Sequence, residues 1–202
     1  MTAPRFISFE GIDGSGKSTQ AKRFAAHLEA AGRPVLLTRE PGGSAGAEEI
    51  RQLLLTGDPD RWSAETETLL FTAARRDHLE KTIEPALAAG KTVVCDRFAD
   101  STRVYQGATR GDLRAMVDAL HALMIGREPD LTFIIDMDPE VALKRGLARR
   151  SGEDRFEEMG LAFQETLRHG FLALAHANPG RCVVIDGNRT PEQIASEIAA
   201  HA

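Results

Sequence analysis

A glycine-rich octapeptide close to the amino terminus sets the strongest limit on the fold of this chain. Residues 11–18 read Gly-Ile-Asp-Gly-Ser-Gly-Lys-Ser and match the pattern G-x-x-x-x-G-K-[ST]. An apolar run at residues 6–9 precedes the motif and a helical pattern over about residues 17–31 follows it, which is the strand-loop-helix context that the motif requires. This context disfavours a simple glycine turn and predicts a site for a nucleoside triphosphate.

The residue types of this loop suit a polyphosphate. Glycine permits backbone conformations in which successive N–H groups converge on one anion, and the amino end of the next helix adds about half a positive charge. Lys17 is expected to reach the β- and γ-phosphates, and the Ser18 hydroxyl to ligate Mg²⁺. The residues expected to bind the triphosphate are Gly11, Asp13, Gly14, Ser15, Gly16, Lys17, Ser18 and Thr19.

Five short apolar runs alternate with segments of helical length. The first is the run at residues 6–9, and the other four are residues 35–38, 92–95, 131–135 and 182–185. Runs of four or five apolar residues are too short for helices and suit strands that are covered on both faces. We therefore predict an α/β fold with three layers, α/β/α, around a five-stranded parallel sheet. No repeat or linker divides the chain, so residues 1–202 are expected to form a single domain.

Helix signals support this pattern. Asp138-Pro139 and Thr190-Pro191 each place a capping side chain before a proline at the first helical position, and Gln193 has capping-box spacing from Thr190. A long helix is predicted between residues 64 and 89, with an apolar stripe that packs in the core or contacts another subunit. The stripe consists of Leu69, Leu70, Ala73, Leu79, Ile83 and Leu87.

Composition limits which partners and which cellular location are expected for this protein. The chain has 25 Lys and Arg against 30 Asp and Glu, a net charge of −5, which disfavours general binding to nucleic acids or anionic membranes. Cys95 and Cys182 lie within apolar runs and are expected to be buried thiols. No leader segment and no run of 18 apolar residues occurs, so a soluble, cytoplasmic protein is expected. The six histidines show no ligand spacing, which leaves Mg²⁺ as the expected metal.

Arginines follow two of the predicted strands. Arg39 and Arg97 are placed at carboxyl ends of strands, where ligands of open parallel sheets bind. Their guanidinium groups suit bidentate phosphate binding and indicate a second anionic substrate, while Asp96 suits a metal- or water-orienting carboxylate. The Asn-Lys-x-Asp guanine signature of GTPases is absent, and the chain is short for a transport or motor ATPase. These observations favour a kinase.

Several segments together resemble the thymidylate kinase family, over nearly the whole chain. They are Arg-Glu-Pro-Gly-Gly at residues 39–43, Phe-Thr-Ala-Ala-Arg at 71–75, Val-Cys-Asp-Arg-Phe-Ala-Asp-Ser-Thr-Arg-Val-Tyr-Gln at 94–106, and Asp-Arg-Phe-Glu at 154–157. The resemblance implies a P-loop NTPase fold of the nucleoside monophosphate kinase type. It also implies transfer of the γ-phosphoryl group of ATP to dTMP, giving dTDP for dTTP biosynthesis, with Mg²⁺ and as a homodimer.

The resemblance also implies roles for individual residues of the acceptor site. Phe71 would stack on thymine, Arg75 would approach the base edge, and Ser101 or Thr102 would read the base. Arg97 would hold the acceptor phosphate, and Tyr105 would pack below the deoxyribose. For Phe71 and Tyr105, a place in the core is the alternative. The implied substrate-binding residues are Arg39, Glu40, Pro41, Phe71, Arg75, Asp96, Arg97, Ser101, Thr102, Tyr105, Gln106 and Phe156.

A charged segment around residues 146–156 resembles the lid of bacterial members of the family. Asp13 is followed by Gly14 rather than by arginine, and the lid region instead supplies Arg145, Arg149, Arg150 and Arg155. The implied catalytic residues are Lys17, Arg97, Arg149, Arg155 and Asp13. The candidate metal ligands are Ser18, Asp13, Asp96 and Glu157, and Asn188 is expected beside the adenine of ATP.

Two other functions remain open from the residues alone. The protein could be a small P-loop kinase for another nucleoside monophosphate or for a deoxynucleoside, and a deoxynucleoside would need Glu10 or Asp96 as a base. It could also be a regulatory protein that binds ATP as a conformational ligand and has no acceptor substrate.

Overall fold

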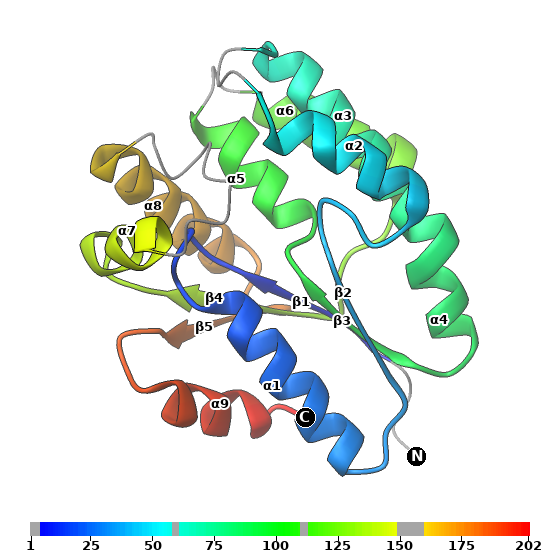
Figure 1. The fold of residues 1–202 in the computed structure, drawn as a ribbon, viewed down its shortest axis with the longest axis vertical. Coiled ribbons are helices and arrows are strands. Elements are labelled where there is room, and N and C mark those ends of the chain that lie inside the picture. The colour runs from blue at the N-terminus through cyan, green and yellow to red at the C-terminus, as the bar shows by residue number, and fades with distance from the viewer. Residues whose placement is uncertain (1–4, 58–60, 110–112, 149–159) are drawn as a thin grey trace.

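A parallel five-stranded sheet forms the centre of the molecule (Figure 1). The computed structural model describes residues 5–57, 61–109, 113–148 and 160–202. The strand order across the sheet is β2-β3-β1-β4-β5, and every pairing is parallel. The strands are β1 (Phe6–Glu10), β2 (Val35–Arg39), β3 (Thr92–Asp96), β4 (Leu131–Asp136) and β5 (Cys182–Asp186).

Helices connect successive strands and cover both faces of the sheet (Figure 1). They are α1 (Lys17–Ala30), α2 (Ala45–Leu55), α3 (Ala64–His78), α4 (Glu84–Ala88), α5 (Ala99–Thr109), α6 (Arg114–Leu120), α7 (Pro139–Ala148), α8 (Leu161–Ala177) and α9 (Pro191–Ala199). Two π-helical turns, η1 (Leu79–Ile83) and η2 (His121–Ile125), extend α3 and α6. The three-layer α/β/α prediction is confirmed.

The core has one layer on each face of the sheet. On one face, Phe9 of β1 packs against Phe24 of α1, with ring centroids 5.9 Å apart, and Ile194 of α9 joins the same cluster. On the other face, Val104 of α5 and Phe171 of α8 pack in a second cluster. Accordingly, α1 and α9 lie below the sheet in Figure 1, and α5 and α8 lie above it. Burial of these aromatic and branched side chains is the main stabilising contribution.

Each strand is one residue longer than its apolar run. The added residue is charged in every strand; these residues are Glu10, Arg39, Asp96, Asp136 and Asp186. The prediction that all five strands are covered on both faces is wrong for the two outer ones. Leu37 of β2 is 41% exposed and Val184 of β5 is 42% exposed, because an edge strand lacks a neighbour whose helices would cover it.

The strand order places a crevice at the carboxyl end of β1. After β1 the chain runs to β2 at one edge and returns through β3, and it then crosses β1 to form β4 on the other side. Ligands of open parallel sheets bind at this kind of reversal, beyond the carboxyl ends of the strands. The loop of residues 11–16 follows β1 at this point.

The predicted long helix is continuous over α3, η1 and α4, but its buried face differs from the predicted stripe. Leu79 and Ile83 are buried in the core, whereas Leu69 is 53% exposed. The helix instead buries several polar side chains, of which Arg75 lines a pocket described below. The buried polar residues are Glu67, Thr68, Thr72, Arg75 and His78.

The predicted helix caps and buried thiols are confirmed. Thr190 and Gln193 form a capping box at the start of α9, and Asp138 accepts hydrogen bonds from two backbone N–H groups at the start of α7. Cys95 and Cys182 are both buried free thiols. Among the described helices, none has the length and apolar character needed to cross a membrane.

An ion-pair network attaches α5 to its surroundings. Asp100 is 1% exposed and accepts hydrogen bonds from Arg103, one turn further along α5, and from Arg181, which precedes β5. Arg103 also donates to Asp118 of α6 and to Glu128 before β4. Three separate parts of the chain are therefore joined to α5 through two guanidinium groups.

We expect Asp100→Ala to lower the free energy of unfolding by about 3 kcal/mol, because a buried ion pair that loses one partner leaves the other charge uncompensated. The matched control is Asp118→Ala, which removes a partner of the same Arg103 from a site that is 43% exposed, and its loss should stay below about 1 kcal/mol. Urea unfolding followed by circular dichroism measures both. Equal losses for the two variants would contradict this account.

Candidate active site

The loop of residues 11–16 lies so close to neighbouring backbone that it requires glycine. At Gly14, with φ of +81°, an added Cβ would lie 1.9 Å from the carbonyl oxygen of Ala142 in α7. At Gly11, with φ of +139°, it would lie 2.7 Å from the carbonyl oxygen of Ile135 in β4. Both positions combine a left-handed backbone with direct contact, so no other residue fits without moving α7 or β4.

The start of α1 has the features of a phosphate site. Its N-cap residue is Gly16, and no side chain of residues 5–57, 61–109, 113–148 or 160–202 caps the first turn of the helix. The N–H groups of such a turn need an acceptor, and an anion can supply it. Lys17 donates from Nζ to the carbonyl oxygen of Ile12 at 3.2 Å and lies 3.5 Å from Asp13 Oδ1. Its ammonium group is thereby held over the loop.

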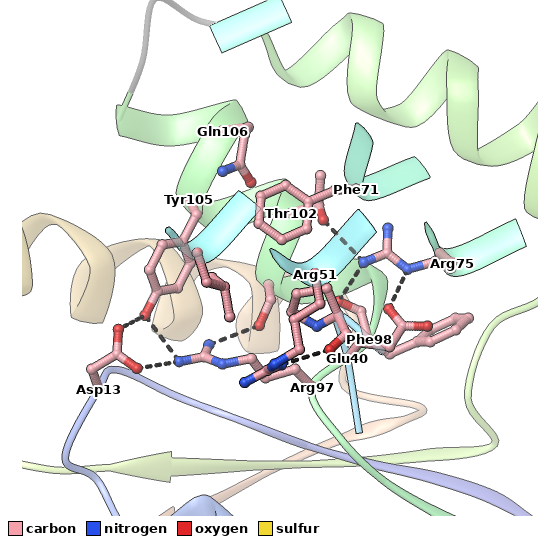
Figure 2. Close-up of a pocket in the computed structure, with 13 residues that line it drawn as sticks. Asp13, Glu40, Arg51, Phe71, Arg75, Arg97, Phe98, Thr102, Tyr105 and Gln106 are labelled. Atoms are coloured by element: carbon pink, nitrogen blue, oxygen red, sulfur yellow. Dashed lines mark hydrogen bonds and ion pairs between the residues drawn. The ribbon is translucent and has the colours of Figure 1, made fainter. Parts of the chain in front are cut away.

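Beside this loop, Arg97 joins β3 to the loop and to α5 (Figure 2). Its guanidinium group pairs with Asp13 and donates to Ser101 Oγ at 3.0 Å and Tyr105 Oη at 3.3 Å. The Tyr105 hydroxyl donates to Asp13 Oδ2 at 2.7 Å. Arg97 has φ of +71°, the one left-handed residue other than glycine in the described ranges. Strained backbone of this kind is common at functional sites.

A second arginine lies at the other end of the same pocket. Arg75 of α3 is 4% exposed and donates from Nε to Glu40 Oε2 at 2.7 Å. Its Nη2 donates to Thr102 Oγ1 at 3.0 Å and to the carbonyl oxygen of Phe98 at 3.2 Å. Glu40 is joined to Pro41 by a cis peptide bond. Figure 2 shows Arg75 and Glu40 on one side of the pocket and Arg97 with Asp13 on the other.

The pocket between the two arginines has a cavity volume of about 140 Å³ and opens to solvent. Small-molecule sites likewise combine apolar walls with a few directed polar groups. The lining residues are Asp13, Glu40, Pro41, Arg51, Leu55, Phe71, Arg75, Arg97, Phe98, Ser101, Thr102, Tyr105 and Gln106.

Most of the residues expected to bind substrate come together in this lining. Ten of the thirteen were expected at the site from sequence, and they come from the loop, the segment after β2, α3, β3 and α5. Tyr105 lines the pocket and also packs edge-on against Phe171, with ring centroids 6.3 Å apart. Phe71 is half-buried in the pocket wall rather than in the core.

Two expected residues lie outside the lining. The Arg39 side chain is 52% exposed and pairs with Glu48 of α2, so the expectation that it lines the acceptor pocket is not met in this structure. Asp96 ends β3, and its buried Oδ1 has no hydrogen-bond partner among the described residues.

Other expected residues are separate from the pocket or lie beyond the described ranges. Asn188 follows β5, and its side-chain oxygen accepts from the N–H of Asp138 at 3.0 Å. Arg145 of α7 contacts the sulfur of Met137. Outside the described residues are Arg149, Arg150, Arg155, Phe156 and Glu157.

Three lining residues were not identified as site residues from sequence: Arg51, Leu55 and Phe98. Arg51 and Leu55 come from α2, and Arg51 donates to the carbonyl oxygen of Pro41 at 2.6 Å. No motif marks α2; it reaches the pocket because it packs against α3. Phe98 belongs to the segment that resembled the family, and its ring lies beneath Arg75, 5.2 Å from the guanidinium carbon.

A buried carboxylate supports the turn that carries Arg97. Glu10, at the end of β1, is 0% exposed; it accepts from the N–H of Phe98 at 2.7 Å and from Ser101 Oγ at 2.6 Å. The pKa of Glu10 is raised to about 7, mainly by burial and also by the nearby Asp100, while its hydrogen bonds and Arg97 act in the opposite direction. Glu10 thus has a structural position behind the site rather than in it.

A phosphate-binding loop at the reversal point of a parallel sheet, next to a pocket with an arginine at each end, defines a P-loop kinase with an adjoining acceptor site. Comparison with known proteins gives the family. A family model described as "Thymidylate kinase" matches residues 9–198, so the chain belongs to the thymidylate kinase family.

Relatives support this assignment along the whole chain. A thymidylate kinase of Dinoroseobacter shibae is 75% identical over 202 residues, covering 100% of this chain and 98% of the relative. One from Ruegeria pomeroyi is 66% identical over 193 residues, covering 96% and 92%. The crystal structure of thymidylate kinase from Ehrlichia chaffeensis matches with a TM-score of 0.79 at 37% identity, covering 99% of each chain.

The raised pKa of Glu10 predicts a pH effect on stability. An unfolded glutamate releases its proton near the ordinary value of 4.5, whereas folded Glu10 holds it to about 7, so the folded state binds more protons between these values. The contribution of Glu10 to stability is present below about pH 4.5 and decreases as pH rises to about 7, by up to about 3 kcal/mol. Unfolding measured from pH 5 to 8 should therefore show that wild type loses stability relative to Glu10→Gln. A constant difference between the two proteins would contradict the shift.

Proposed function

We propose that this protein transfers the γ-phosphoryl group of ATP to the 5'-phosphate of dTMP, giving dTDP. One observation carries the proposal. Arg97 and Tyr105 of the acceptor pocket both bind Asp13 of the phosphate loop, so the two substrate sites share a boundary. Membership of the thymidylate kinase family supports dTMP as the acceptor.

The chain's own residues account for most of the reaction chemistry. A phosphate monoester has a second pKa of about 6, so the attacking oxygen of dTMP is already anionic at neutral pH and needs no strong base. Catalysis then consists of alignment and charge neutralisation. We assign Lys17 to the transferred phosphates of ATP and Arg97 to the phosphate of dTMP. Asp13 holds Arg97 in position from the loop side.

The rest of the pocket suits the nucleoside of dTMP. Phe71 offers a flat ring for stacking, worth about 1 to 3 kcal/mol for a base on an aromatic side chain. At the far end, Arg75 and Thr102 offer polar groups to the base edge. We assign Tyr105, which is 6% exposed and held by Asp13, to the space under the sugar, where its bulk would reject a 2'-hydroxyl group.

Oxygen ligands that suit Mg²⁺ lie at the phosphate loop. Ser18 is in the first turn of α1, and Asp96 is paired in the sheet with Phe9, close to where the loop begins. In the part of the chain that the structure describes, Oδ1 of Asp96 has no hydrogen-bond partner, which fits a role as ligand to the ion or its water, whereas Arg97 and Tyr105 already bind Asp13. We propose that Ser18 and Asp96 hold Mg²⁺ together with the triphosphate. When bound, the ion neutralises phosphate charge.

The remaining assignments rest on the family resemblance. We propose that residues 146–156 form a lid of this single domain, and that Arg149 or Arg155 reaches the transferred phosphoryl group. Arginines in that role contribute about 10³ to 10⁵ in rate in other phosphoryl-transfer enzymes. We also propose that Asn188 contacts the adenine of ATP and that the protein acts in the cytoplasm.

A homodimer is also proposed, and exposed apolar side chains support it. Leu123 and Met124 of η2 are 80% and 47% exposed, and Leu69 of α3 is 53% exposed. These two elements lie side by side, since Arg76 of α3 donates to the carbonyl oxygen of Met124.

Leu123→Glu should convert the protein from a dimer to a monomer of 22.0 kDa, because it places a charge in an apolar contact. Light scattering after gel filtration measures the mass. As a control, Leu147→Glu changes a leucine of α7 that is 51% exposed and should leave the mass unchanged. A monomeric wild-type protein would contradict the proposed dimer.

Lys17→Ala and Arg97→Ala should each reduce phosphorylation of dTMP by at least about 10³-fold, since each removes a positive charge from the reacting phosphates. Arg97→Ala should in addition weaken binding of dTMP more than of ATP. Coupled detection of ADP measures both effects, and Arg23→Ala, which removes an arginine paired with Glu192 on the surface, serves as control. Normal turnover by either variant would refute these assignments.

A panel of acceptors tests the function itself. Wild-type protein is incubated with Mg-ATP and each of dTMP, other monophosphates and deoxynucleosides, and the phosphorylated products are separated. dTDP should be the main product. Preferred phosphorylation of another acceptor, or ATP binding without any product, would favour the alternatives raised by the sequence.

A further inference from the structure

A fully buried histidine lies behind the base end of the pocket. His78, the last residue of α3, is 0% exposed and does not line the pocket. Its Nδ1 lies 3.1 Å from Glu40 Oε1, and its Nε2 lies 2.7 Å from Thr38 Oγ1. Glu40 in turn accepts from Arg75 through its other oxygen. A chain of hydrogen bonds therefore runs from β2 through His78 and Glu40 to Arg75.

The direction of the central hydrogen bond follows from the groups involved. A carboxylate paired with a guanidinium group only accepts, so Nδ1 of His78 carries the hydrogen and donates it to Glu40. The other side of the imidazole is closed by backbone. A Cβ at Gly43 would lie 2.3 Å from His78 Nε2 and 2.5 Å from Thr38 Oγ1. The ring is thus held between Gly43 and Glu40 with little room to turn.

This chain determines which atoms Arg75 presents to a ligand. Nε is used by Glu40, and Nη2 is used by Thr102 and by the carbonyl oxygen of Phe98. Within the described part of the chain, Nη1 has no hydrogen-bond partner, and in Figure 2 no dashed line reaches it. Arginine has no acceptor atom, so the group that meets Nη1 must be an acceptor.

We propose that His78 is a positioning residue for nucleobase selection. It fixes Glu40, and Glu40 in turn fixes the guanidinium group of Arg75. The pocket then accepts pyrimidines that present an oxo group to Arg75 and rejects those that present an amino group. The inference rests on the proposed function, because it assumes that a pyrimidine nucleotide occupies the pocket. His78 itself contacts no substrate. A buried donor that meets a second donor stays unpaired, which is the physical basis of the rejection.

Two substitutions at His78 separate its two hydrogen bonds. The side-chain amide of asparagine reaches about the position of Nδ1, and that of glutamine reaches about the position of Nε2. His78→Asn therefore keeps the donor to Glu40, whereas His78→Gln keeps the contact with Thr38 and loses Glu40. Thr38→Val is the matched control, since it disturbs the same buried chain while leaving His78 bonded to Glu40.

Steady-state kinetics with dTMP and dCMP as acceptors give the readout. His78→Gln should raise KM for dTMP about tenfold and lower the ratio of kcat/KM for dTMP over dCMP about tenfold, with KM for ATP unchanged. His78→Asn and Thr38→Val should keep the wild-type ratio. An unchanged ratio in His78→Gln, or equal increases in KM for both substrates, would overturn the inference. Failure of the wild-type protein to phosphorylate dTMP would instead overturn the proposed function.

A measurement on the wild-type protein tests the role of His78 if His78→Gln does not fold. Nitrogen-15 spectra should show the His78 proton on Nδ1, and saturating dTMP should shift the His78 Nδ1 and Arg75 Nε signals. The buried His121 of η2 serves as the internal reference and should not shift. A His78 signal that does not respond to dTMP, or a proton on Nε2 alone, would overturn the inference.

Discussion

The ion pair between Asp13 and Arg97 is the contact on which the rest of the site depends. Asp13 belongs to the phosphate loop after β1, and Arg97 belongs to the turn after β3, so the pair joins two neighbouring strands at their carboxyl ends. Tyr105 of α5 binds both partners and adds a helix to the same cluster. Arginine is always charged and offers several donors in one plane, so it can bind Asp13 and still face a phosphate.

Polar burial around the pocket carries an energetic cost that the remainder of the fold offsets. The inner face of α3 buries Arg75 and His78, where an apolar helix would bury leucine. Arg75 keeps Glu40 as its partner, because an unpaired buried charge would cost several kcal/mol. Glu40 accepts hydrogen bonds from both Arg75 and His78, and Glu10 accepts one from the backbone N–H of Phe98. Aromatic packing on both faces of the sheet supplies the stability that such a site requires.

Much of this arrangement was predictable because short-range patterns carry it. Apolar runs located all five strands to within one residue, and the capping box at Thr190 located the start of α9. Side-chain exposure was less predictable, since it depends on which strands lie at the edges of the sheet. The buried polar face of α3 was missed for a related reason: periodicity shows which residues share a face, but it does not show what that face meets.

The phosphate loop, the parallel α/β class and the family resemblance were determined by the sequence alone, because each depends on residues close together in the chain. Only the tertiary structure decided which distant side chains share the pocket. It brought Arg51 in through the packing of α2 on α3, left Arg39 on the surface with Glu48, and placed His78 behind Arg75. These outcomes depend on the angles between packed elements and on competition among neighbouring charges for the same partner. Neither quantity is encoded in local spacing, so both become visible only when the chain is folded.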